Sequence, residues 1–387
     1  MKVLVLDLVH GGKTVAEKFA AKGDDVTAVD VQQVVGKDVT GSLTRRGIRV
    51  LKAIPAEDFD VCARPCCGPD PAPADCAEVI DFSGAVNRLF DPYDRRFRIE
   101  VTGGPGKTML CFVIAHILDA AGRRVYLHSS HGMGPYHGSR HIITDYQSTS
   151  VQSLLELPRT EYEAVVCEVA AGGSGRADIS VIAGSAEGKE ECLKGVLSPG
   201  INIVREDERP VWERFGKPIR SAGRRVSVIG DAVPDESLRV TVNYRGTTEI
   251  VLGEGYLALQ YLDAFNMALA VCDAMDIPEE DVISGLSSFP GAPGRGETDS
   301  EDGVFIVKDH NSGVSLSSIR NTVGVLGKMG ISDGVFLDVS DLSDGGHTDL
   351  SPEGISRLAA ECGATVLDGP VPEGAAADIR AVKEPFH

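Results

Sequence analysis

The residues best suited to chemistry lie in the stretch 99–110, which reads IEVTGGPGKTML. A short β-branched run predicts a strand, the glycines predict a tight turn, and apolar residues at helical spacing follow. Such a turn directs successive backbone N–H groups toward an anion, and the start of the helix adds positive potential. A lysine there reaches the outer phosphates of a nucleotide, and the next hydroxyl holds Mg²⁺. We therefore expect ATP or GTP, with Mg²⁺, to bind through Gly103, Gly104, Gly106, Lys107 and Thr108.

This loop is a tighter variant of the general phosphate-loop pattern, GxxxxGK followed by Ser or Thr. The general pattern requires glycine at position 101, where this chain has Val101. A turn that merely joins a strand to a helix is the alternative. Gly-Lys-Thr at the start of the predicted helix favours a phosphate site.

Glu168 is the second candidate for the nucleotide site. It stands near the end of the apolar run 162–170, YEAVVCEVA, which predicts a buried strand. A carboxylate in the sheet that carries the phosphate loop is suited to hold the Mg²⁺ of the nucleotide. A glutamate that simply faces solvent is the alternative.

Histidines gather after another predicted strand, 124–128. The stretch 128–141 reads HSSHGMGPYHGSRH. We expect a glycine-rich substrate-binding loop at the carboxyl end of a parallel strand, where open α/β sheets bind ligands; a solvated loop is the alternative. The candidate substrate-binding residues are His131, His137, Arg140 and His141, together with His10 in the first turn of the chain. Basic residues nearby in sequence are Arg95, Arg96, Arg98, Arg123 and Arg124.

The elements around these residues predict an α/β protein. The chain opens with a βαβ unit made of strand 2–7, helix 14–21 and strand 25–30. This unit lacks the GxGxxG pattern of dinucleotide sites, so NAD is not expected. The Pro-rich stretch 61–75 predicts an irregular connection.

Length and composition bound the class of protein. The 387 residues suit two or three domains, which we place at 1–93, 94–297 and 298–387. The net charge of −19 disfavours nucleic acid or an anionic membrane as a partner. No apolar run approaches the length of a membrane span, so we expect a cytoplasmic protein; a homo-oligomer is left open. Nine cysteines, an odd number, favour reduced thiols.

Four signals, taken in order, resemble the Mur ligases, the ATP-dependent family that makes acyl phosphates from carboxylates. They are the phosphate loop, Glu168, an Asn266-bearing helix followed by PGAPGRGE at 290–297, and Asp309-His310-Asn311 at the start of the last domain. The resemblance implies Rossmann-like N- and C-terminal domains flanking a central P-loop ATPase domain. It implies that Asn266 contacts the nucleotide base, Arg295 reaches the nucleotide across the domain junction, and Asp309 contacts the ribose. Lys107, Glu168 and Arg295 would be catalytic, and Thr108 and Glu168 would hold Mg²⁺.

The chain departs from the peptide-forming members of that family. Those members carry an Asn…Asp-His stretch and then a carbamylated lysine, whereas 182–194 has no Asp-His pair and offers only Lys189 or Lys194. The opening LVLDLVHGG, the Cys-rich segment and the His-rich stretch look instead like the divergent branch of methanogens. That likeness implies a nickel tetrapyrrole substrate. ATP would phosphorylate a propionate of a seco-precursor, and a ring carbon would attack the acyl phosphate to close a six-membered ketone.

An intramolecular nucleophile needs no site for a second substrate, which agrees with the missing features. Two alternatives stay open. An amide-forming Mur-type ligase would join an amino acid to a carboxylate and would need an added amine. A nucleotide-binding regulator would use ATP only to close its domains.

Overall fold

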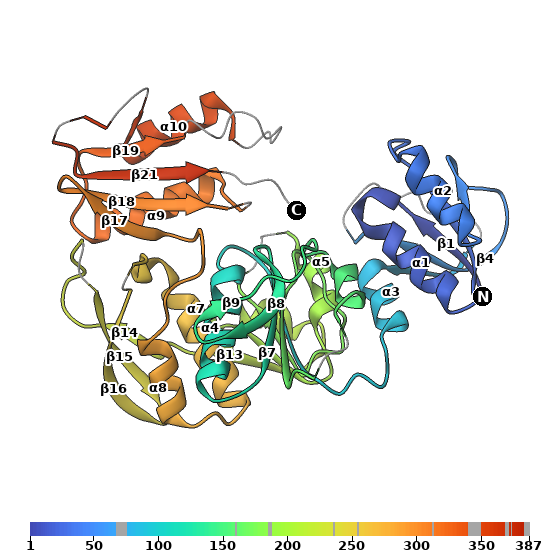
Figure 1. The fold of residues 1–387 in the computed structure, drawn as a ribbon, viewed down its shortest axis with the longest axis horizontal. Coiled ribbons are helices and arrows are strands. Elements are labelled where there is room, and N and C mark those ends of the chain that lie inside the picture. The colour runs from blue at the N-terminus through green and yellow to red at the C-terminus, as the bar shows by residue number, and fades with distance from the viewer. Residues whose placement is uncertain are drawn as a thin grey trace.

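The structure is a computed structural model. It describes residues 1–66, 76–158, 161–184, 188–234, 237–253, 255–311, 313–339, 350–367, 371–372 and 374–382. The strands of these residues form four sheets, three of them largely parallel. Figure 1 shows the N-terminal sheet and its helices on one side of the central domain, and the C-terminal domain on another. The expected α/β fold is confirmed.

The N-terminal sheet is wholly parallel, in the order β3-β2-β1-β4-β5. Its elements are β1 (Lys2–Leu6), the π-helical turn η1 (Leu8–Gly12), α1 (Lys13–Ala21), β2 (Asp25–Val29), α2 (Lys37–Arg45), β3 (Arg49–Leu51), β4 (Phe59–Arg64), β5 (Cys76–Asp81) and α3 (Phe82–Leu89). The last four residues of β1 are apolar and buried, as expected of a parallel strand covered on both faces.

Strand β4 corrects one prediction. The stretch from residue 61 was expected to be irregular, but Phe59–Arg64 pairs with both β1 and β5. Val61, Cys62 and Ala63 are buried at the middle of the sheet, so their apolar character outweighs the prolines that follow them. Residues 67–75 of that stretch lie outside the described part of the chain.

The central sheet has the order β13-β12-β11-β6-β10-β7-β8-β9. Its elements are β6 (Phe97–Thr102), α4 (Lys107–Ala120), β7 (Val125–Ser129), β8 (Gly132–His137), β9 (Arg140–His141), η2 (Val151–Leu155), β10 (Ala164–Glu168), β11 (Ile179–Ile182), α5 (Glu190–Leu193), η3 (Lys194–Val196), β12 (Ile201–Arg205), η4 (Glu206–Glu208), α6 (Arg209–Glu213) and β13 (Ile219–Ala222). Helix α4 begins at Lys107 and buries eleven of its 14 residues, because it packs between the sheet and two further helices, α7 (Leu262–Ala274) and α8 (Glu279–Ser287).

The histidine-rich stretch is a hairpin, so the predicted loop is wrong. β7 pairs antiparallel with β8, and β8 pairs with the short β9. The glycines that predicted a loop instead allow another part of the backbone to pack closely against the hairpin. A Cβ atom at Gly134 would lie 1.9 Å from the carbonyl oxygen of Ile142.

The central domain ends in an antiparallel sheet and three helices. These are β14 (Val226–Val228), β15 (Leu238–Tyr244), β16 (Gly246–Leu252), η5 (Ala258–Tyr261), α7 (Leu262–Ala274) and α8 (Glu279–Ser287). The C-terminal domain has the sheet order β17-β18-β21-β19-β20, in which only β17 is antiparallel to its neighbour. Its elements are β17 (Glu297–Glu301), β18 (Val304–His310), α9 (Leu316–Lys328), β19 (Val335–Asp338), α10 (Pro352–Cys362), β20 (Thr365–Val366) and β21 (Ala377–Val382).

The N-terminal domain is joined to the central one by helix α3. Phe82, Ala85 and Val86 of this helix share an apolar cluster with Val151 and Leu154 of η2. Within the described residues, no helix has both the length and the apolar character needed to span a membrane. Seven of the described cysteines form no disulfide, whereas Cys192 is disulfide-bonded, so the expectation of reduced thiols is wrong for Cys192.

Candidate functional site

The carboxyl ends of four neighbouring strands meet at one edge of the central sheet. Strands β11, β6, β10 and β7 lie side by side and are parallel. The phosphate loop follows β6, Glu168 ends β10, and Ser130 follows β7. Parallel strands bring such residues to the same edge. Two of the sequence-predicted groups, the loop and Glu168, therefore lie together.

Glycine geometry holds the phosphate loop. Gly103 has φ 112°, and a Cβ atom there would lie 2.5 Å from the carbonyl oxygen of Gly184. The amide of Gly104 donates to that same carbonyl at 2.8 Å. Gly106 has φ 96° and precedes the first residue of α4. Positive φ and contact with a backbone oxygen both exclude a side chain at Gly103.

Lys107 lies over this loop. Its Nζ donates to the carbonyl oxygens of Gly103 and Gly104 at 3.0 and 3.1 Å. The ammonium group and the N-terminal end of α4 therefore add positive potential at the same place. This is the position predicted for the phosphate-binding lysine.

Three side chains with oxygen atoms that can bind a metal converge beside the loop. The Thr108 hydroxyl oxygen lies 3.0 Å from both carboxylate oxygens of Glu168. The Ser130 amide donates to Glu168 Oε2 at 2.9 Å, and the Ser130 hydroxyl lies 3.2 Å from that of Thr108. Glu168 is only 4% exposed. A carboxylate with two hydroxyls is the hard oxygen set that suits Mg²⁺ shared with phosphates, so these residues fit the metal that the resemblance implies.

Ser130 is a site residue that sequence reasoning missed. A single serine after a strand has no signature of its own. The signal that would have found it is strand order, because β7 lies next to β10, the strand that ends in Glu168.

Arg295 reaches this cluster from the linker before the C-terminal domain. Its Nη2 donates to the hydroxyls of Thr108 and Ser130 at 3.1 and 2.9 Å. Its Nε is buried and has no hydrogen-bond partner among the described residues. A buried guanidinium donor without an acceptor is costly, and an anionic ligand oxygen would satisfy it. The geometry agrees with the nucleotide contact that the resemblance implies for Arg295.

Asp309 fixes the linker that carries Arg295. Its Oδ1 accepts from the amide of Gly296 at 2.8 Å, and the Thr322 hydroxyl lies 3.4 Å from its Oδ2. Asn311 Nδ2 donates to the carbonyl oxygen of Gly294 at 2.8 Å. Burial raises the pKa of the Asp309 carboxyl above its ordinary value. Asp309 thus positions the linker in this structure, and its contact with a ribose stays a prediction.

Asn266 anchors helix α7. Its Oδ1 accepts from the backbone amides of Arg225 and Val226 at 2.7 and 2.8 Å. This ties the helix to the start of β14. Only the side-chain NH₂ group is left for a nucleotide base, and that contact also stays a prediction.

The structure separates His137 from the other two histidines expected to share one ligand. His137 pairs through Nδ1 with Asp119 Oδ1 at 3.0 Å, near the C-terminal end of α4. The hairpin register places it beside the first residues of β7, at the opposite end from Ser130. Arg140 is exposed on β9 in the same turn region. His137 and Arg140 therefore do not join the phosphate site.

The ring of His141 is held against the hairpin, and its contact with a nickel tetrapyrrole stays a prediction. Its Nε2 lies 3.2 Å from the carbonyl oxygen of Leu127, and its Nδ1 is buried without a partner among the described residues. Burial, together with His131, lowers the pKa of His141 to about 4. The ring of His131 packs against the rings of Phe112 and His141. Of the three histidines, His131 alone follows β7 directly after Ser130.

Two of the basic residues before the phosphate loop, Arg96 and Arg98, are held in ion pairs within the protein. Arg96 and Arg98 each donate to Asp94 Oδ2 at 2.7 Å, and the Arg98 guanidinium lies over the ring of Phe90. Burial opposes ionisation of Asp94, but the hydrogen bonds from Arg96 and the charge of Arg98 lower its pKa to about 2. These arginines are therefore not available to a substrate. Lys194, one candidate for a carbamylated lysine, instead pairs with Glu191 at 2.7 Å on the surface.

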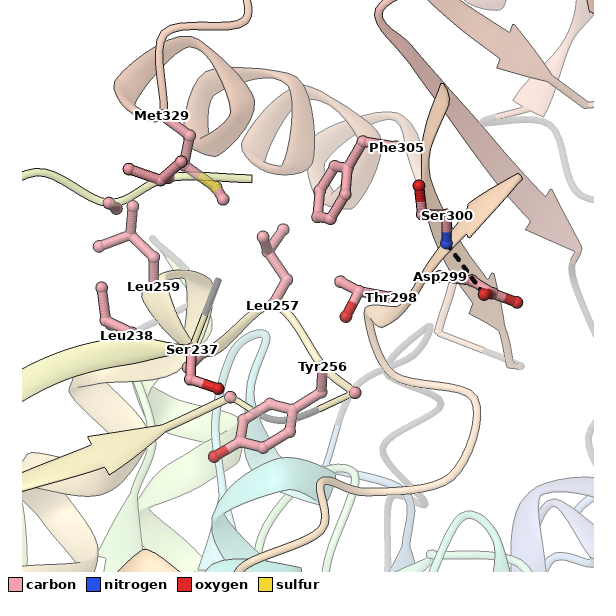
Figure 2. A pocket seen from close by; sticks show the side chains of 15 residues that line it. Ser237, Leu238, Tyr256, Leu257, Leu259, Thr298, Asp299, Ser300, Phe305 and Met329 are labelled. Carbon is pink, nitrogen blue, oxygen red and sulfur yellow. Dashed lines mark hydrogen bonds between the residues drawn. The ribbon is translucent and has the colours of Figure 1, made fainter. Parts of the chain in front are cut away.

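A cavity of about 220 Å³ lies away from the phosphate loop. Figure 2 shows Leu257 and Leu259 of the central domain facing Phe305 and Met329 of the C-terminal domain across it. None of the predicted site residues lines it. The cavity belongs to the junction between the domains.

Comparisons with known proteins agree with this architecture. No family model matches the chain. The chain is 26% identical over 374 residues to coenzyme F(430) synthetase of Methanosarcina acetivorans, covering 83% of this chain and 79% of the relative. It is similar to the structure of MurF ligase of Thermotoga maritima in complex with ADP, with TM-score 0.56, 14% identity and coverage of 92% and 91%. For folylpolyglutamate synthase of the same organism the TM-score is 0.54, the identity 14% and the coverage 77% and 89%.

These likenesses confirm the predicted resemblance to the Mur ligases and the three-domain α/β architecture. The structural likenesses concern the fold, because the sequence identities are low. Together with the sequence relative, they support an ATP-dependent ligase.

Proposed function

We propose that this protein is an ATP-dependent ligase that closes the last carbon ring of a nickel tetrapyrrole. The substrate would be the seco precursor of coenzyme F430, and the products would be coenzyme F430, ADP and phosphate. The observation that carries the proposal is the convergence of Lys107, Thr108, Glu168 and Arg295 at one sheet edge. The choice of substrate is supported by the likeness to coenzyme F(430) synthetase.

The first step is phosphoryl transfer. A propionate oxygen of the substrate attacks the γ-phosphorus of ATP, the bond to ADP breaks, and an acyl phosphate forms. Charge that develops on the transferred group is stabilised by Lys107 and Arg295. Mg²⁺ held by Thr108, Glu168 and Ser130 would neutralise phosphate charge in this step.

The second step is ring closure. A ring carbon of the same molecule attacks the acyl carbon, a carbon–carbon bond forms, and inorganic phosphate leaves. Holding both reacting atoms in one bound molecule supplies a proximity contribution of up to about 7–11 kcal/mol. This chemistry needs no second substrate site.

The test is turnover of the purified protein with ATP, Mg²⁺ and the seco precursor in the absence of any amine. We expect ADP and phosphate in equal amounts and a product that has lost one water relative to the substrate, followed by absorption and mass spectrometry. A requirement for an added amine would favour the amide-forming ligase. ATP binding without ADP formation under all these conditions would favour the nucleotide-binding regulator.

A further inference from the structure

The first turn of the chain holds a carboxylate–imidazole pair that the nucleotide site does not use. Asp7 follows β1 at the carboxyl edge of the N-terminal sheet, and His10 lies in the turn η1. His10 Nδ1 lies 2.5 Å from Asp7 Oδ2. The side chain of Asp7 is 10% exposed, whereas that of His10 is 61% exposed. The pair therefore has a buried carboxylate and an accessible imidazole.

One tautomer of this imidazole matches the hydrogen bonds of the Asp7 carboxylate. Asp7 Oδ1 accepts from the amides of Val9 and His10 at 2.9 and 3.2 Å, so the carboxylate acts as an acceptor throughout. Gln32 Nε2 lies 3.4 Å from Asp7 Oδ2 and 3.3 Å from His10 Nδ1. With the ring proton on Nδ1, both His10 and Gln32 donate to the carboxylate. In the neutral ring this leaves the lone pair on Nε2. An exposed, oriented Nε2 is the arrangement of a general base.

The backbone of this turn is strained around the pair. Asp7 has φ 67° and ψ 94°, and a positive φ is unfavourable for a non-glycine residue. The turn is also tightly packed. A Cβ atom at Gly12 would lie 2.1 Å from the carbonyl oxygen of Asp7, and one at Gly11 would lie 1.6 Å from Gln152 Nε2. Strain maintained by such packing is a feature of functional sites.

A short path of contacts joins the pair to the phosphate site. Gln152 Nε2 donates to the carbonyl oxygen of His10 at 3.3 Å, and Gln152 belongs to η2 of the central domain. Just before η2, the carbonyl oxygen of Thr149 accepts from the amide of Ala170 at 2.7 Å. Ala170 stands two residues after Glu168. His10 therefore lies on the part of the N-terminal domain that contacts the central domain.

The surroundings of His10 suit a large apolar ligand. Val9 and Val34, which follow β1 and β2 at the same sheet edge, are 46% and 66% exposed. Among charged groups on the elements packed against the turn, Asp30 is buried after β2, and Lys13 is exposed at the start of α1. Asp7 is thus the carboxylate in direct contact with the imidazole.

We propose that His10 is the general base of ring closure and that Asp7 is its positioning residue; this inference rests on the proposed function. Nε2 of His10 takes the proton from the ring carbon as that carbon attacks the acyl phosphate. The carbon–carbon bond forms, the bond between the acyl carbon and the phosphate oxygen breaks, and phosphate leaves with the electron pair. The resulting imidazolium is stabilised by the Asp7 carboxylate.

The test compares His10→Gln with His137→Gln as the matched control. His137 is likewise an exposed histidine paired with a carboxylate, Asp119, but it lies at the far end of its hairpin. The acyl phosphate is trapped with hydroxylamine in single-turnover reactions, and ring closure is followed by absorption. We expect H10Q to form the acyl phosphate at the wild-type rate and to close the ring about 100-fold or more slowly. H137Q should match the wild type in both steps.

A pH profile separates a base from a merely structural residue. Ring closure by the wild type should decline on the acid side as His10 becomes protonated, and this decline should be absent in H10Q. Asp7→Asn, with the melting temperature recorded to check folding, should slow ring closure while the acyl phosphate still forms at the wild-type rate. Ring closure by H10Q at the wild-type rate would overturn this inference and leave the proposed function standing. A wild-type protein that forms no acyl phosphate would overturn the proposed function, and the inference with it.

Discussion

Replacing Arg295 with lysine tests whether this residue acts on the nucleotide or only links two domains. The arginine places Nη2 within hydrogen-bond distance of two hydroxyls and leaves Nε buried without a partner in the described structure. A lysine keeps the positive charge but has no planar fork of donors. R295K therefore removes directional contacts while it preserves the net charge of the site.

The expected loss follows from the number of contacts. A hydrogen bond from a charged donor contributes about 1.5–3 kcal/mol, and a lysine at this position would replace at most one of the two contacts that Nη2 and Nε offer a phosphate. The loss of one such contact, about 1.5–3 kcal/mol in the transition state, corresponds to a rate roughly 10- to 160-fold lower. Because the proposed contacts are to the transferred group, kcat should fall more than the affinity for ATP.

The assay is single-turnover ADP formation with ATP and the tetrapyrrole in excess over their dissociation constants. Arg140→Lys is the control, since Arg140 is exposed on β9 and lies outside the phosphate site. ADP formation by R295K within threefold of the wild-type rate would refute the reasoning and leave Arg295 as a linker residue.

Three further predictions follow from the site and its support. Lys107→Ala should abolish measurable ADP formation while the circular dichroism spectrum and melting temperature stay unchanged, because the loop is held by glycine contacts; turnover within tenfold of wild type would contradict this. Ser130→Ala removes one hydroxyl but keeps the hydrogen bond from the backbone amide of residue 130 to Glu168. ADP formation should therefore fall about tenfold at saturating Mg²⁺, and the Mg²⁺ concentration needed for half-maximal activity should rise. Asp94→Asn should lower the free energy of unfolding by about 2 kcal/mol at pH 7, measured by urea titration. The pKa of Asp94 is lowered to about 2, so its contribution is present above the unfolded pKa of about 3.9 and is lost as the pH falls toward 2. An equal difference between D94N and wild type at pH 7 and pH 2.5 would contradict this linkage.

The sequence predicted those parts of the site that depend on local pattern. The phosphate loop is one continuous stretch, and its strand, turn and helix lie where the residues indicated. Arg295 and Asp309 were identified by resemblance, and the structure brings both to the domain junction. Ser130 was missed because its role depends on which strand lies next to β10, and this is a property of the whole sheet.

Glycine caused the largest error in the fold. In the stretch 128–141, glycines spaced among histidines indicated a loop. In the structure, Gly132 and Gly134 allow residues 142–145 to approach β8 closely, since a Cβ atom at Gly134 would lie 1.9 Å from the carbonyl oxygen of Ile142. A sequence does not distinguish a glycine needed for a turn from one needed for close packing. The strand β4 was missed for a related reason, since prolines just beyond it obscured its buried residues.

The contact between Gly103 and Gly184 carries a consequence for how such proteins diverge. The two residues are 81 positions apart, yet the backbone of one loop rests directly on the backbone of the other. A mutation that gives position 103 a side chain must displace the loop after β11 as well, so neither loop can change its path independently. We expect sequences that keep a glycine at position 103 also to keep the length of the loop after β11. In an alignment of descendants of this chain, insertions near 184 should be rare wherever the phosphate loop is intact, and loss of that glycine should mark lineages that have abandoned ATP.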